Sequence, residues 1–202
     1  MARTQAPEYE ERREKIVEKA ADLIAELGFR GTTLGELAIA CEYSKSLIYY
    51  YFSSKEEILY AVMASHVDVL VEDVSNVTAL HRPPREALGM LIRTFMQHYV
   101  GAASRQKVLL NELNSLPEDK RAIVVAKQRR VIDAVQSLLV EIEPSLRGDE
   151  ARARVKTMLL LGMINWTHTW FDHGGPVSSE DVADMVCELI GIGRPISPQP
   201  AD

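Results

Sequence analysis

Residues 33–52 read TLGELAIACEYSKSLIYYYF, and this stretch decides the fold. It contains two short helical segments, near 33–40 and 44–51, joined by a tight turn. The preceding segment, 9–27, carries apolar residues at the spacing of one face of an amphipathic helix. Two short helices braced by a third predict a helix-turn-helix, in which the second helix enters the major groove of DNA.

Helical spacing assigns an inner and an outer face to the second of these helices. Ile48 and Phe52 form an i, i+4 apolar pair, which suits packing against the other two helices. Lys45 with Tyr49 forms a further pair on the remaining surface, and Ser46 pairs with Tyr50 in the same way. A lysine there reaches guanine acceptors or a phosphate, and tyrosine hydroxyls suit phosphate oxygens. The alternative is that the tyrosine-rich helix is only core.

The same stretch resembles the TetR family of bacterial regulators. The matching residues are Gly28-Phe29, Thr32-Thr33-Leu34, Leu37-Ala38, Ser44-Lys45, Ile48 to Phe52, and Ser54 to Glu57, within residues 10–60. The resemblance implies a homodimer on a palindromic, double-stranded DNA operator. Spacing and resemblance together give this set of expected DNA contacts: Thr33, Ser44, Lys45, Ser46, Leu47, Tyr49, Tyr50, Tyr51 and Lys55. Thr33 could instead be a helix cap without a phosphate role.

Three departures from the family pattern leave the operator sequence open but not the binding mode. Gly35 stands where a longer polar residue is common. Cys41-Glu42-Tyr43 replaces the usual turn of a small residue, glycine and valine. Leu47 stands where threonine is common, so that an apolar contact replaces a polar one.

Bulk charge does not support DNA binding. The formal net charge is −6, and the first sixty residues carry eight Lys and Arg against eleven Asp and Glu. Any DNA-binding surface must therefore be local, with its acidic groups turned away from the phosphates. No apolar run approaches the ~18 residues of a membrane span, and the N-terminus is charged, so we expect a cytoplasmic protein without a membrane partner.

Nearly every segment has helical periodicity, which predicts an all-α protein. The expected helices lie near 9–27 (ending at Gly28), 33–40, 44–51, 55–76, 84–102, 105–114, 117–142, 150–172 and 178–192. Capping boxes are expected at Thr33–Glu36, Ser54–Glu57 and Ser115–Glu118, with simple N-caps at Asp149 and Ser178. We divide the chain into a DNA-binding domain at 1–55, a ligand-binding and dimerisation bundle at 56–192, and a flexible tail at 193–202.

The bundle should also form the dimer and hold an effector. Family resemblance implies dimerisation through the last two helices, and residues 159–164 (LLLGMI) are apolar nearly all round. Val182, Met185, Val186, Leu189 and Ile190 offer a second apolar stripe. The expected effector-binding residues are Phe95, His98, Tyr99, Arg105, Asn111 and Trp166.

The segment from Gly162 to Phe171, with Gly174-Gly175-Pro176 after it, resembles TetR regulators that respond to acyl-CoA thioesters. That resemblance implies a repressor released by an apolar or acyl-CoA effector of a catabolic pathway. An alternative is a regulator of efflux or stress genes that senses a drug-like apolar ligand. Trp166 and Trp170 could also simply anchor the dimer.

Two other classes of protein are alternatives. An enzyme, such as an acyl-CoA hydrolase, would need a nucleophile or metal motif, and G-x-S-x-G, H-E-x-x-H and the P-loop are absent from the sequence. His168, Asp172 and His173 come nearest to a metal cluster, but only His168 and Asp172 share a helical face, and a flexible Gly-Gly lies beside them, so we expect no catalytic residues, metal or cofactor. An interaction module, whose helix-turn-helix binds protein instead of DNA, is the other class. Cys41 and Cys187 are expected to be packing residues.

Overall fold

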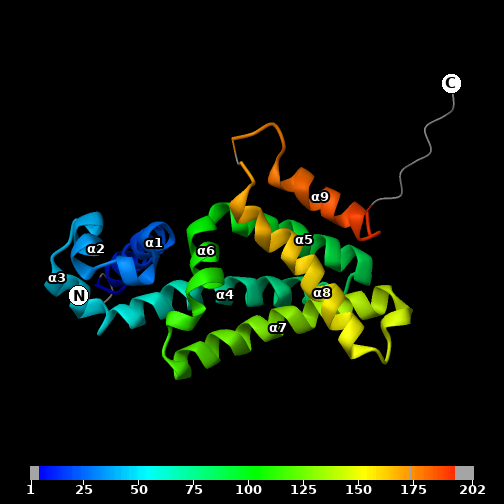
Figure 1. Cartoon of the computed structure of the whole chain (residues 1–202), viewed down its shortest axis with the longest axis horizontal. Coiled ribbons are helices and arrows are strands. Elements are labelled where there is room, and N and C mark those ends of the chain that lie inside the picture. Colours follow the sequence, from blue (N-terminus) through cyan, green and yellow to red (C-terminus); the bar gives the residue numbers. More distant parts are fainter. Residues whose placement is uncertain (1–4, 173, 194–202) are drawn as a thin grey trace. The chain divides into compact units, whose positions relative to one another are not determined.

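The computed structural model describes residues 5–172 and 174–193, and within these ranges every regular element is helical (Figure 1). The α-helices are α1 (Gln5–Gly31), α2 (Leu34–Cys41), α3 (Lys45–Tyr51), α4 (Lys55–Ala79), α5 (Pro84–Gly101), α6 (Ala103–Glu112), α7 (Glu118–Ile142), α8 (Glu150–Asn165) and α9 (Ser179–Leu189). Three short 3₁₀ helices follow α6, α7 and α8: η1 (Leu113–Ser115), η2 (Pro144–Leu146) and η3 (Trp166–Thr169). The all-α prediction is confirmed.

Side-chain caps begin several of these helices where the sequence predicted them. Thr33 and Glu36 form the full capping box of α2, with the Glu36 amide 3.2 Å from Thr33 Oγ1 and the Thr33 amide 2.8 Å from Glu36 Oε2. Ser178 caps α9 in the same reciprocal way with Asp181, and Asp149 caps α8. At α4, Ser54 Oγ accepts from the amide three residues on.

The capping box predicted at Ser115–Glu118 is wrong. Ser115 Oγ donates to the carboxylate of Glu112, 2.8 Å away, and α7 starts at Glu118 itself. The N-cap position of α7 is therefore occupied by Pro117, which lies two residues after Ser115. Ser115 closes the 3₁₀ turn that follows α6 instead of opening α7.

The uninterrupted part of helix α1 ends at Gly28, where the sequence predicted the end of the first helix. Gly28 has φ 74° and ψ 160°, which breaks the helix, but one more helical turn continues to Gly31. Glycine alone adopts this backbone region readily, because it has no Cβ. The break turns Phe29 into the protein, where its side chain is buried.

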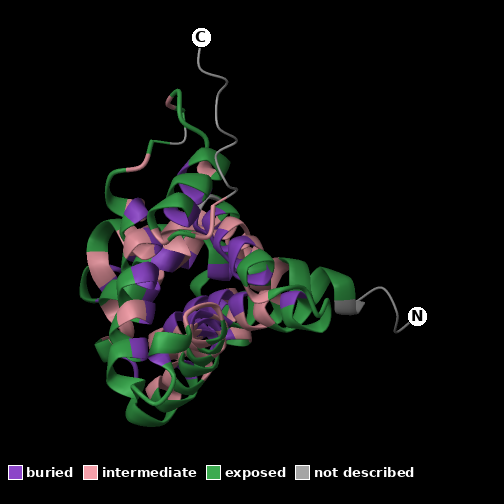
Figure 2. Ribbon diagram, turned by 90° about the vertical axis from the view of Figure 1, so that its right-hand side faces the viewer, coloured by how far each residue is buried: buried purple, intermediate pink, exposed green. Residues whose placement is uncertain are grey.

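The helices divide into two compact units, which we call unit 1 (residues up to 69, with 102–128) and unit 2 (residues 70–101, with 129 onward). Helix α6 and the first part of α7 thus fold with the three N-terminal helices, a grouping that the predicted functional boundary at residue 55 does not show. Figure 2 shows buried residues on the inward sides of the helices and exposed residues on their outer sides. In unit 1, α6 packs against α1, and α2 packs against α1 and α3.

Unit 2 is built around α5, which packs against α8 and α9. Its core is apolar and includes Leu88, Ile92, Phe95, Met96 and Leu160, all 2 % exposed or less. Cys187 is buried in the same cluster, and Cys41 is buried in unit 1; both are free thiols, as predicted. The predicted tail, apart from Gly193, lies outside the described residues. None of the helices in the described ranges is long and apolar enough to cross a membrane.

The eighth helix is shorter than the predicted 150–172. It ends at Asn165, and η3 follows. Thr167 Oγ1 donates to the carbonyl of Ile164 (2.6 Å) and Thr169 Oγ1 to that of Trp166 (2.8 Å), so local side chains compete for the carbonyls that a continuing helix would use. Trp166 and Trp170 therefore do not form an i, i+4 pair on one α-helix.

Candidate nucleic-acid interface

Helices α2 and α3 form the predicted helix-turn-helix. The turn is closed by two backbone hydrogen bonds, from the Glu42 amide to the Ile39 carbonyl (3.0 Å) and from the Tyr43 amide to the Ala38 carbonyl (2.9 Å). Glu42 itself adopts a left-handed conformation, with φ 59° and ψ 38°. The family usually has glycine here because this conformation costs a residue with a Cβ about 1–2 kcal/mol.

The inner face of α3 is the predicted apolar pair. Ile48 is fully buried and Phe52 is 5 % exposed, which anchors the middle and the C-terminal end of this short helix. The guanidinium of Arg13, on α1, lies over the Phe52 ring, 5.0 Å from its centroid. At the start of α3, Ser44 Oγ accepts from the Leu47 amide (3.1 Å), so Ser44 acts as the N-cap and Leu47 lies half-buried beside it.

The outer face of α3 presents lysine, serine and tyrosine. Lys45 and Ser46 are exposed, and Tyr49 and Tyr50 are 56 % and 70 % exposed. The alternative in which the tyrosine-rich helix is only core is therefore wrong for these two rings. A seven-residue helix composed only of Lys, Ser, Leu, Ile and Tyr adds no negative charge to this exposed surface. Such a face can offer an ammonium and hydroxyls to phosphates and base edges.

The side chain of Lys45 lies against the first turn of α2. A Cβ placed on Gly35 would be 3.1 Å from Lys45 Cε and 3.2 Å from Nζ, which is closer than ordinary van der Waals contact, so the end of the lysine would have to shift. The absence of a side chain at Gly35, a departure from the family pattern, thus makes room for the end of Lys45. The exposed Thr33 lies at the start of the same turn and keeps its hydroxyl in the cap.

Two predicted DNA contacts have a different environment from the one expected. Lys55 Nζ donates to the carbonyls of Phe29 (2.8 Å) and Thr32 (2.9 Å) and lies 4.3 Å from the centroid of the Phe29 ring. Its ammonium therefore ties the end of α1 to the start of α4, instead of reaching freely for a phosphate. Tyr51 is half-buried and its ring lies tilted against that of Tyr9, with ring centroids 4.7 Å apart.

Several acidic residues of unit 1 are already engaged by neighbouring side chains. Glu14 pairs with Arg105 on α6, and Asp22 accepts from Ser104 Oγ at 2.8 Å. The Glu112 carboxylate accepts from the Phe29 amide at 3.1 Å, next to the break at Gly28. These contacts fasten α6 to α1.

Within the described residues, the predicted effector-binding residues are divided between the two units. Phe95 and Tyr99 belong to the core of unit 2, whereas Trp166 is 65 % exposed. Arg105 pairs with Glu14 in unit 1, and Asn111 is exposed there. The sequence could not show this, because helical periodicity identifies an inward face but not what packs against it.

The fourth residue of this predicted group in unit 2, His98, lies beside a carboxylate. His98 Nε2 is 2.9 Å from Asp73 Oδ2. Burial raises the pKa of Asp73, and the nearby His98 only partly offsets this effect. The imidazole of His98 is therefore already in contact with a partly buried carboxyl group of unit 2.

A cavity of about 370 Å³ lies within unit 2 among the end of α4, the start of α5 and α7. Its apolar lining includes Val77, Ala87, Leu91 and Leu138, and its polar lining includes His81 and Arg82. None of the six predicted effector-binding residues is among the described residues that line this cavity. The sequence did not indicate this cavity, because its lining brings the α4–α5 connection together with the last part of α7, which is distant from it in the chain.

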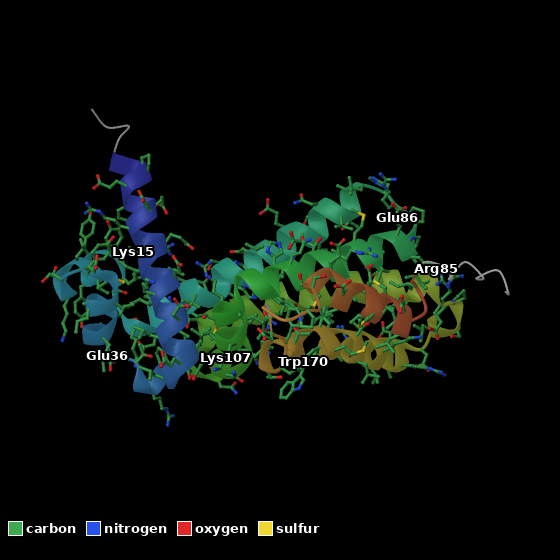
Figure 3. The ribbon with its side chains drawn as sticks, turned by 90° about the horizontal axis from the view of Figure 1, so that it is seen from above. Lys15, Glu36, Arg85, Glu86, Lys107 and Trp170 are labelled. Carbon is green, nitrogen blue, oxygen red and sulfur yellow. The ribbon has the colours of Figure 1, made fainter. Side chains whose placement is uncertain are left out.

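Helices α8 and α9 carry exposed apolar side chains in addition to their buried ones. On α8 these are Val155, Met158, Leu159 and, at its end, Trp166, which share one helix face with the exposed Gly162; on α9 they are Met185 and Leu189. The predicted stripes divide, because Leu160, Leu161, Val182 and Val186 are buried within unit 2. Trp170, 59 % exposed, extends away from the ribbon in Figure 3. An exposed apolar patch rimmed by charge is typical of a protein–protein interface.

Both parts of the chain match models of one family. Residues 16–62 match the model described as bacterial regulatory proteins, tetR family, and residues 81–193 match the model described as tetracyclin repressor-like, C-terminal domain. The chain belongs to the TetR family. The helix-turn-helix of this TetR protein lies wholly within the first matched segment.

Solved structures and a curated relative agree with this assignment. A TetR-family transcriptional regulator from Bordetella parapertussis is 38 % identical, with a TM-score of 0.86 over 90 % of this chain and 94 % of that one. AibR, solved in complex with isovaleryl coenzyme A and operator DNA, is 27 % identical, with a TM-score of 0.77 over 88 % and 97 % of the two chains. The regulator HbdR of Aromatoleum sp. is 25 % identical over 89 % of this chain and 77 % of its own length.

Proposed function

We propose that this TetR protein is a cytoplasmic, homodimeric repressor that binds a palindromic operator through α3 and is released by a small-molecule effector. The observation that carries the proposal is the two-faced α3, with Ile48 and Phe52 buried while Lys45, Tyr49 and Tyr50 are exposed. One face of the helix is thus packed against the protein and the other is exposed and polar, as a recognition helix in the major groove requires. We propose a regulator and not an enzyme.

The dimer is proposed to form through the exposed apolar face of α8 and α9. In a symmetric dimer the same patch serves both protomers, and two reading helices must lie about 34–36 Å apart to enter successive major grooves. Leu159, 66 % exposed, and Leu189, 77 % exposed, would be covered by the partner. Gly162, which is exposed and has no atom within 4 Å of where a Cβ would lie, leaves room for a close helix crossing.

An acyl-CoA thioester is the effector class that we propose. The support comes from the structural neighbour AibR, which was solved with isovaleryl coenzyme A and operator DNA, and from the resemblance of residues 162–171 to acyl-CoA-responsive regulators. A ligand relieves repression only if it binds the DNA-free shape more tightly than the DNA-bound shape. Thermal-shift measurements with short acyl-CoA thioesters, against coenzyme A and the free acids, test this class, because a ligand that binds only the native state raises its melting temperature.

DNA binding is tested by selecting duplexes from a random library and measuring affinity by fluorescence anisotropy. Lys45→Ala and Tyr49→Phe should each weaken binding without changing the dimer. Lys107→Ala is the matched control, because Lys107 is an exposed lysine on α6. If neither α3 substitution changes the affinity for the duplex, the outer face of α3 does not bind DNA. The same conclusion follows if both substitutions weaken binding no more than Lys107→Ala does.

The proposed dimer is tested separately by analytical ultracentrifugation. Leu159→Glu places a charge in the α8 face and should shift the protein toward monomer, since a buried unpaired carboxylate is costly. Leu80→Glu is the control, because Leu80 is also exposed (51 %) but lies at the end of α4. Equal effects of the two substitutions on the dimer, or none, would contradict the proposed interface.

A further inference from the structure

Helix α1 begins well before the segment that matches the family model. The match starts at Ile16, whereas the described helix starts at Gln5. We call residues 5–15 the N-terminal extension. Its side chains contact the helix-turn-helix at three places: Tyr9 contacts α3, Arg13 lies over Phe52, and Lys15 lies over Tyr43 with Nζ 5.1 Å from the ring centroid. In Figure 3 Lys15 is labelled on this part of α1.

The contact at Tyr9 is a cluster of three aromatic rings. Tyr9 lies tilted on Tyr51, with centroids 4.7 Å apart and planes at 38°. It meets Tyr50 edge to face at 6.1 Å and 76°, and Tyr50 meets Tyr51 edge to face at 5.2 Å and 89°. Each pair has the offset or T-shaped geometry that aromatic rings favour. Tyr50, 70 % exposed, is therefore held by two rings while most of its surface stays free.

An exposed tyrosine without such neighbours would sample several rotamers. Binding DNA would then fix one of them, and that loss of freedom would weaken the complex. The two ring contacts of Tyr50 restrict its orientation before DNA arrives. Tyr51, half-buried in the same cluster, links Tyr9 to the recognition helix a second time.

We infer that Tyr9 is a positioning residue for DNA recognition, which orients the Tyr50 side chain, and with it Tyr51, on the outer face of α3. This inference rests on the proposed DNA-binding function and adds the N-terminal extension to the DNA-reading surface. The ring of Tyr9 carries the effect, since the described contacts are ring to ring. Tyr9→Phe should therefore keep the effect and Tyr9→Ala should lose it.

The test measures binding of the full-length protein to a selected duplex by anisotropy at several salt concentrations. We expect Tyr9→Ala to weaken binding roughly three- to tenfold, given the usual strength of aromatic pairs. Tyr9→Phe should bind as the unsubstituted protein does. The slope of affinity against salt should not change in Tyr9→Ala, because Tyr9 is assigned no phosphate contact.

A double-substitution cycle separates positioning from simple support of α1. On the Tyr50→Ala background, Tyr9→Ala should have little further effect, because the side chain it orients is gone. As a second readout, fluorotyrosine NMR of the DNA-free protein should show a shifted Tyr50 resonance in Tyr9→Ala, assigned with Tyr50→Phe. Circular dichroism checks that the fold is retained.

The outcomes are distinct for the two claims. If the unsubstituted protein binds duplex DNA but Tyr9→Ala binds equally well, the inference is overturned and the proposed function stands. The inference is also overturned if Tyr9→Ala weakens binding equally on the Tyr50→Ala background and in the otherwise unsubstituted protein. It is overturned as well if Tyr9→Ala leaves the Tyr50 resonance unshifted. If the unsubstituted protein shows no salt-sensitive duplex binding, both the proposed function and the inference are overturned.

Discussion

Replacement of Gly28 by alanine tests how the end of α1 is built. Gly28 has φ 74° and ψ 160°, a region that residues with a Cβ occupy at a cost of about 1–3 kcal/mol. A Cβ there would also lie 3.3 Å from Oε1 of Glu112, the atom that accepts from the Phe29 amide at 3.1 Å. Backbone strain and the disturbed hydrogen bond therefore both lower the stability of the substituted protein. The hydrogen bond matters because it attaches α1 to the end of α6.

We expect Gly28→Ala to lower the free energy of unfolding by about 2 kcal/mol, with the backbone strain as the larger part. For a chain of this size the melting temperature should fall by roughly 4–8 °C. Urea denaturation followed by circular dichroism, at fixed protein concentration, measures the first quantity, and a thermal scan measures the second. Fixed concentration matters because dimerisation couples to stability.

Gly31→Ala is the matched control for this experiment. It lies three residues further along the same helix, and a Cβ there would meet only Leu27 Cβ, at an ordinary 3.5 Å. Alanine should therefore be neutral or slightly stabilising at Gly31, since it is the better helix former. A Gly28→Ala protein as stable as the unsubstituted one, or no less stable than Gly31→Ala, would refute the strain argument.

Three further substitutions have expected outcomes. Glu42→Gly should raise the free energy of unfolding by up to about 1 kcal/mol in urea denaturation, because glycine relieves the left-handed backbone at φ 59°; a loss of stability would contradict this. Gly35→Ala should raise the melting temperature through helix propensity but weaken duplex binding by displacing the end of Lys45, and unchanged binding would show that the position of Lys45 is unimportant. Burial raises the pKa of Asp73, so its carboxyl group favours folding below its ordinary pKa and loses that contribution as the pH rises through the folded value. Asp73→Asn should therefore stabilise the protein at pH 7, with an advantage that fades by about pH 4 in paired urea titrations, and a constant difference would contradict the sign.

The sequence was sufficient where the deciding interactions are local. Thr33 and Glu36 are three residues apart, so their capping box could be predicted from spacing alone. The burial of Ile48 and Phe52 followed in the same way from the i, i+4 spacing of a helix. The resemblance to TetR regulators depended on the same short stretch, which explains why fold class and family could be predicted together.

The sequence was insufficient where a side chain finds a partner far along the chain. Lys55 meets the carbonyls of Phe29 and Thr32, more than twenty residues away, and no local pattern encodes that pairing. Arg105 pairs with Glu14 across a still longer separation, a partner that the sequence did not indicate. The contact of Tyr9 with the recognition helix belongs to the same class. Tertiary packing determines each of these three contacts, and helical periodicity in the sequence does not indicate which distant segments pack together.

The most direct test of the central claim is the salt dependence of duplex binding by the unsubstituted protein and by Lys45→Ala. If α3 lies in the major groove with Lys45 at a phosphate, affinity should fall steeply as salt rises, and Lys45→Ala should reduce that slope by about one. Binding to a selected duplex that is insensitive to salt, or an identical slope and affinity after loss of the lysine, would contradict the assignment of α3 as the DNA-reading helix.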